Sequence, residues 1–100
     1  MARPKIKIRQ DQITDFCRRY QVQRLALFGS VLRDDFAPAS DVDVLVTFEP
    51  QAQIGFMTLG RMKRELAALF QRPVDLVPQD GLKPMIRDEV LNSAAVIYAA

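Results

Sequence analysis

The chain has 100 residues, of which 49% are hydrophobic and 26% charged, and its net charge is +2 at pH 7. These values are typical of one globular domain, and such a small net charge does not favour direct binding of nucleic acid through bulk electrostatics. The sequence holds one cysteine and no histidine, which excludes an internal disulfide, histidine-based catalytic triads and most zinc sites.

The same features predict a single domain over residues 1–100 in the cytoplasm, away from a membrane. Cys17 lies on an apolar helical stripe, so a buried free thiol in a reducing compartment is expected. No apolar leader follows Met1. The longest unbroken apolar stretch, Ala94–Ala100, is far shorter than the ~20 residues that span a bilayer.

The first predicted element is an amphipathic helix. Its apolar residues recur at helical spacing, at Ile13, Phe16, Cys17 and Tyr20. We expect Asp11 to cap its start and Arg18 and Arg19 to lie in its last turn. Three strands are then predicted from apolar runs that end at glycine, proline or charged residues: Leu25–Phe28, Asp41–Phe48 and Val74–Val77.

Two further helices are predicted in the second half of the chain. Apolar residues at helical spacing indicate a long helix over residues 54–71. A last helix starts near Pro84, with Ile86, Val90 and Leu91 facing inward. Met57, Met62 and the C-terminal segment AAVIYAA are expected to belong either to the core or to a contact surface, and the core is the favoured assignment.

The connection lengths predict an α/β (α+β) fold, in which helices flank a small three-stranded mixed sheet. Only ten residues separate Ser30 from Asp41, which favours antiparallel pairing of the first two strands. The second and third strands are joined by a longer, helical connection, which favours a right-handed parallel unit. This topology would bring Ser30, Asp41, Asp43 and Asp75 to one edge of the sheet.

Acids gathered at the buried end of a strand require a compensating cation. Residues i and i+2 of a strand point to the same face, so Asp41 and Asp43 would repel each other unless they bind a metal. Hard oxygen ligands with open positions suit Mg²⁺, and a third carboxylate allows two such ions. Gly29 would let a ligand approach the backbone, while Ser30 and Arg33 could contact a phosphate.

Simpler interpretations remain open for each motif alone. A single Asp-x-Asp is usually a pair of exposed acids, a Gly-Ser after a strand is usually a turn, and Arg33 could pair with Asp34 or Asp35. The combination, however, resembles the GS-x10-DxD motif of the minimal nucleotidyltransferases, which are relatives of DNA polymerase β. The segments LALFGS, SDVDVLV, PVDLV and IRDEVLNSAAVIY all have counterparts in the MNT antitoxins of HEPN/MNT toxin–antitoxin pairs.

This resemblance implies a Mg²⁺-dependent transfer of AMP from ATP to a tyrosine hydroxyl of a cognate HEPN ribonuclease toxin, which is thereby silenced in a hetero-oligomer. It implies triphosphate binding by Gly29 and Ser30, and metal binding and catalysis by Asp41, Asp43 and Asp75. The role of Arg33 as a phosphate contact is our own inference. Two alternatives remain: a non-catalytic antitoxin that acts by occlusion, and a nucleotidyltransferase that acts on RNA or a small molecule.

Overall fold

The computed structural model describes residues 6–32 and 41–100, and these form the α/β architecture expected from the sequence. The order of elements along the chain is α1 (Gln10–Arg19), β1 (Val22–Phe28), the 3-10 turn η1 (Gly29–Leu32), β2 (Val42–Phe48), α2 (Phe56–Phe70), β3 (Val74–Pro78), the 3-10 turn η2 (Gln79–Gly81), α3 (Pro84–Ser93) and β4 (Ala95–Ala99).

The sheet has the strand order β3-β2-β1-β4. The predicted directions are confirmed, since β1 pairs with β2 antiparallel and β2 pairs with β3 parallel. The predicted number of strands is wrong by one, because β4 pairs antiparallel with the free side of β1. This strand could not be read from its own five residues, since a short apolar run becomes a strand only when a neighbour supplies the hydrogen bonds.

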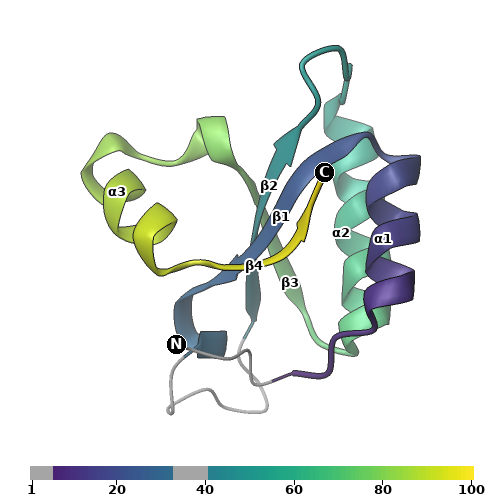
Figure 1. Ribbon diagram of the computed structural model, residues 1–100, viewed down its shortest axis with the longest axis horizontal. Helices are drawn as coiled ribbons and strands as arrows, with labels where there is room; N and C mark the ends of the chain where they lie inside the picture. The colour runs from purple at the N-terminus through teal and green to yellow at the C-terminus, as the bar shows by residue number, and fades with distance from the viewer. Residues whose placement is uncertain (1–5, 33–40) are drawn as a thin grey trace.

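The two faces of the sheet are covered by different helices. Helices α1 and α2 lie side by side on one face, and α3 lies on the other (Figure 1). The larger core cluster joins the first face to these two helices, and Phe16, Met62 and Leu66 are fully buried in it. A smaller cluster lies beneath α3, where Ala26 and Leu45 are buried.

Three details of the predicted helices are wrong. The N-cap of α1 is Arg9, which makes no side-chain capping bond, and Asp11 lies inside the first turn. Ile86 is 44% exposed and Met57 is 84% exposed, so neither belongs to the core. Met57 precedes Met62 by five residues, which places them about 140° apart around the helix axis. A helix that packs with one stripe leaves such a position in solvent.

The predicted thiol environment is confirmed. Cys17 is a free cysteine buried between α1 and the sheet, and burial raises its pKa to about 12. Since the thiolate is the reactive form, burial lowers the reactivity of this sulfur at neutral pH. No helix in the described part of the chain combines the length and apolar character that a membrane span requires.

Candidate active site

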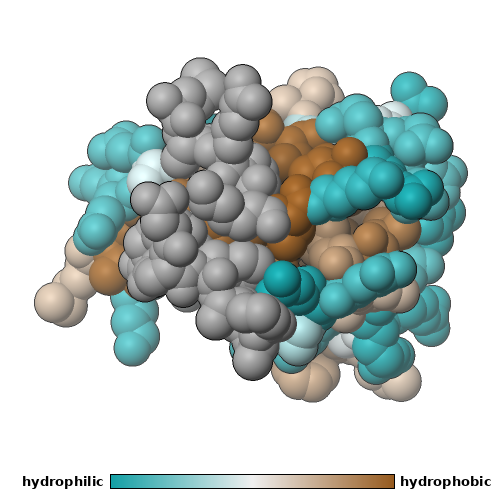
Figure 2. All heavy atoms as spheres, turned by 90° about the horizontal axis from the view of Figure 1, so that it is seen from below, coloured by the Kyte–Doolittle hydropathy of each residue, from teal (hydrophilic) through white to brown (hydrophobic). Residues whose placement is uncertain are grey.

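The candidate site lies at the edge of the sheet where β1 ends and β2 and β3 begin. In Figure 1 this is the lower edge, and Figure 2 looks directly onto it. On this side of the molecule, hydrophobic side chains gather near the centre and hydrophilic side chains border them (Figure 2). The chain turns sharply at η1, immediately after Phe28.

The strand registers align two of the predicted acids. Phe28 is opposite Asp43 in the β1–β2 pair, and Asp43 is opposite Asp75 in the β2–β3 pair. Residues in register on neighbouring parallel strands point to the same face, about 4.8 Å apart along the hydrogen-bonding direction. The two carboxylates therefore project from the same face, which is the face that carries Leu45 and α3.

Gly29 is held against the Asp43 carboxylate. Its φ of +78° lies in the left-handed region, which residues with a side chain rarely adopt. A Cβ at this position would overlap with Asp43 Oδ2 and would stand 3.2 Å from Asp43 Cγ. Two features therefore require glycine at this position: the backbone conformation and the close approach of the half-buried Asp43 carboxylate.

Replacing Gly29 with alanine is expected to lower the free energy of unfolding by about 1–3 kcal/mol, which is the typical cost of a left-handed non-glycine residue. The Cβ must also displace the carboxylate of Asp43. Urea denaturation of the two proteins measures the difference. The matched control is Gly81→Ala, because no heavy atom lies within 4 Å of a Cβ built there. Equal stability of Gly29→Ala and the wild type would contradict this account of the turn.

The other predicted site residues differ in how far the structure describes them. Asp41 is exposed and directly precedes β2, two residues before Asp43 on the same strand path. Ser30 belongs to the η1 turn by its backbone. Its side chain and the whole of Arg33 lie outside the described residues.

The donor set fits a metal ion that keeps several ligand positions for substrate. Within residues 6–32 and 41–100, no three acidic, histidine or cysteine side chains are grouped so as to hold an ion alone. Asp43 and Asp75 nevertheless present hard oxygen atoms side by side. Mg²⁺ commonly binds through one or two carboxylates, and water and substrate phosphates complete its shell.

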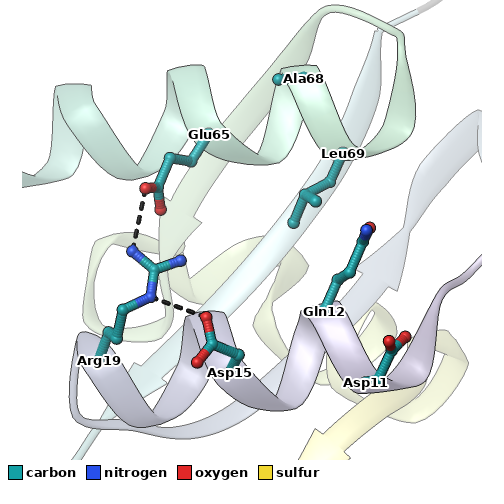
Figure 3. Close-up of a pocket in the computed structure, with 7 residues that line it drawn as sticks. All are labelled: Asp11, Gln12, Asp15, Arg19, Glu65, Ala68 and Leu69. Atoms are coloured by element: carbon teal, nitrogen blue, oxygen red, sulfur yellow. Dashed lines mark hydrogen bonds and ion pairs between the residues drawn. The ribbon is translucent and has the colours of Figure 1, made fainter.

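A cavity between α1 and α2 lies apart from this edge and contains none of the predicted site residues. Its volume is about 470 Å³, and Asp11, Asp15 and Glu65 give it an acidic lining (Figure 3). Arg19 donates hydrogen bonds to Asp15 Oδ2 and to Glu65 Oε1, both at 3.0 Å. The bond to Glu65, followed by the bond to Asp15, raises the pKa of Arg19. This arginine links the two helices, so the cavity has a structural explanation.

The sequence analysis did not single out Phe56, an exposed apolar residue beside β3. Phe56 is 91% exposed at the start of α2, next to the exposed Met57. The available signal was their position outside the stripe formed by Met62, Leu66 and Phe70, the buried residues of that helix. Large apolar side chains at such positions often mark an interaction surface.

Comparison with known proteins identifies the family to which this chain belongs. Residues 9–97 match the nucleotidyltransferase domain family. The chain therefore belongs to this family.

Individual proteins and solved structures that resemble this chain give a more detailed comparison. Protein adenylyltransferase MntA of Thermococcus cleftensis is 35% identical over 80 residues, which cover 80% of this chain and 77% of that protein. A solved structure described provisionally as a minimal nucleotidyltransferase is 34% identical, with a TM-score of 0.70 and 85% of each chain covered. The same fold, at 19% identity and a TM-score of 0.65, occurs in the complex of a tri-AMPylated Shewanella oneidensis HEPN toxin with an MNT antitoxin, with 91% of this chain and 70% of that chain covered.

Proposed function

We propose that this chain is an antitoxin that transfers AMP from ATP to a tyrosine hydroxyl of a HEPN ribonuclease toxin in the cytoplasm and so silences it. The observation that carries the proposal is the register of the sheet, which aligns Asp43 with Asp75 and holds Asp43 against Gly29. The 35% identical relative is named as a protein adenylyltransferase, and the S. oneidensis complex contains an AMPylated HEPN toxin.

In this mechanism the turn at Gly29 and Ser30 receives the triphosphate, and Arg33 contacts a phosphate. Asp41, Asp43 and Asp75 would hold Mg²⁺, with one or two ions bound together with the substrate. The metal supplies positive charge that screens the phosphate oxygens and the developing charge of the leaving group. Because Asp43 and Asp75 lie on two paired strands, little reorganisation of these two carboxylates is required when the nucleotide binds.

Asp75 orients the acceptor. It is exposed on the edge strand, whereas Asp43 is half-buried on the neighbouring inner strand. The acceptor oxygen attacks the α-phosphorus of ATP and forms a new O–P bond. The bond from that phosphorus to the oxygen bridging to the β-phosphate breaks, and pyrophosphate leaves with the electron pair. The hydroxyl proton passes to Asp75, which thus acts as general base.

Intact-mass spectrometry of a cognate HEPN protein tests this function. Incubation with wild-type chain and Mg²⁺-ATP is expected to add one or more adenylyl groups to that protein and to reduce its ribonuclease activity. Removal of the metal with EDTA is expected to stop the transfer, and added Mg²⁺ to restore it. Silencing of the ribonuclease without any mass increase would contradict the proposal.

That contrary result would favour the second candidate function, which is neutralisation by binding alone. The exposed Phe56 and Met57 favour it, because exposed apolar side chains can serve occlusion as well as substrate docking. The two functions differ in their need for ATP. An occluding antitoxin would silence the ribonuclease equally well without nucleotide and in the presence of EDTA.

A further inference from the structure

Among the described residues, no strand pairs with the outer edge of β3. Within the described chain, β3 pairs with β2 alone and ends the strand order on that side. At the opposite edge, Gln10 Nε2 donates to the carbonyl oxygen of Ile97 at 2.9 Å, so a side chain of α1 occupies part of the β4 edge. An open edge offers main-chain groups to an added strand.

The hydrogen bonds of β3 show which groups are directed outward. The amide of Val42 donates to the carbonyl oxygen of Pro73 at 2.8 Å. In a parallel pair, alternate residues bond to the neighbouring strand, so the N–H and C=O groups of Val74 and Leu76 are directed away from β2. Only Pro78 lacks a donor among the five residues of β3.

A groove runs beside this edge on the side of α2. Its volume is about 310 Å³, and its lining is mostly apolar: Phe56, Leu59, Gly60, Lys63, Leu76 and Pro78. Phe56 is almost completely exposed, which is unfavourable for a large aromatic side chain that has no further contact to make.

The charge near the groove is positive. Lys63 is the one charged residue among its described lining residues. The guanidinium of Arg64 lies 3.6 Å from the place where a Cβ on Gly60 would stand. The groove therefore complements a segment that has an apolar side chain close to acidic ones.

We propose that an extended segment of the acceptor protein adds to β3 as a further strand, with an apolar side chain in this groove and the acceptor residue beside Asp75. The inference rests on the proposed function and names how its protein substrate docks. Successive residues of a strand point to opposite faces. Leu76 lies on the groove side with the larger core cluster, and Asp75 lies on the other face.

This alternation sets the spacing in the docked segment. The apolar anchor and the acceptor residue lie on opposite faces of the added strand. Their positions in the segment therefore differ by an odd number. Since β3 rises about 3.3 Å per residue, the distance from Asp75 to Pro78 is about 10 Å. The acceptor residue is therefore one or three positions from the anchor. Pairing with β3 then places this residue close to the acids of the site.

The test compares Phe56→Arg with Met85→Arg, which changes a 94% exposed methionine on α3. Both residues lie in solvent, so neither change is expected to alter the thermal midpoint. Calorimetric titration with the HEPN protein is expected to show at least tenfold weaker binding for Phe56→Arg and unchanged binding for Met85→Arg. The Kd for Mg²⁺-ATP should stay the same in both variants.

Hydrogen exchange of the wild-type complex gives an independent result. The outward amides of Val74 and Leu76 are expected to become protected when the HEPN protein binds. Unchanged exchange there, wild-type affinity of Phe56→Arg, or no complex with the wild-type chain would each overturn the inference. So would a wild-type homodimer that Phe56→Arg abolishes, because the occupant would then be a second copy. Binding that depends on Phe56 without any AMP transfer would instead refute the proposed function and leave the docking edge in place.

Discussion

Replacing Asp43 with asparagine is expected to reduce AMP transfer to the HEPN protein by about 10³-fold or more, which corresponds to about 4 kcal/mol of transition-state stabilisation. Asparagine keeps the shape of the side chain that lies against Gly29 but removes its charge. A neutral amide is a poor ligand for Mg²⁺, and it leaves the phosphate charge uncompensated at the inner strand. The initial rate of adenylyl incorporation, followed by intact-mass spectrometry, measures the loss.

The control for this change is Asp88→Asn, because Asp88 is an exposed acid on α3 that lies outside the proposed site. Its rate should equal that of the wild type. The affinity of Asp43→Asn for the HEPN protein should also be unchanged, since the docking edge is formed by other residues. A wild-type rate of transfer by Asp43→Asn would show that the metal assignment is wrong.

Replacing Asp75 with asparagine is expected to reduce transfer by about 10²-fold, the order of effect of losing a general base or one charged group at a reacting centre. In the absence of metal, the same substitution is not expected to lower the stability of the protein. Asp75 and Asp43 are in register on neighbouring strands, so removing one charge relieves repulsion between like groups. The thermal midpoint in EDTA is therefore expected to be equal to or above that of the wild type, while the stabilisation by Mg²⁺ and nucleotide becomes smaller.

Asp80→Asn is the matched control, since Asp80 is exposed in η2, just beyond the other end of β3. It should change neither the transfer rate nor the response to Mg²⁺. A fall in the metal-free midpoint of Asp75→Asn would mean that this carboxylate stabilises the fold directly. The repulsion between the two acids would then be the smaller effect.

One short strand connects the proposed chemistry with the proposed docking. Asp75 faces the side of the sheet that carries α3, while the next residue, Leu76, lines the groove beside α2. A protein substrate bound along this strand would have its acceptor residue placed by backbone hydrogen bonds. This would explain how so small a domain could select a protein substrate.

Much of the site was accessible from local patterns. Gly29 and the acids on either side of Val42 were identified from a glycine after an apolar run and an acidic pair before one. The strand directions followed from connection lengths, because ten residues are too few for a parallel crossover. The alignment of Asp75 with Asp43 then followed from topology, although thirty-two positions separate them in the sequence.

Tertiary packing decided the features that no single segment specifies. The segment from Ala95 to Ala99 is a strand because β1 offers it a free edge, and the same five residues alone show only a short apolar run. Met57 resembles a core residue in composition, but the orientation of α2 on the sheet leaves it in solvent. Thus the sequence by itself predicted the three helices, three of the four strands and the directions of those strands, and it marked the acids as candidates, since these depend on local periodicity and on the reach of the chain. Only the tertiary structure decided which strand edge stays open and which apolar side chains remain unburied, because both depend on how the completed layers cover one another.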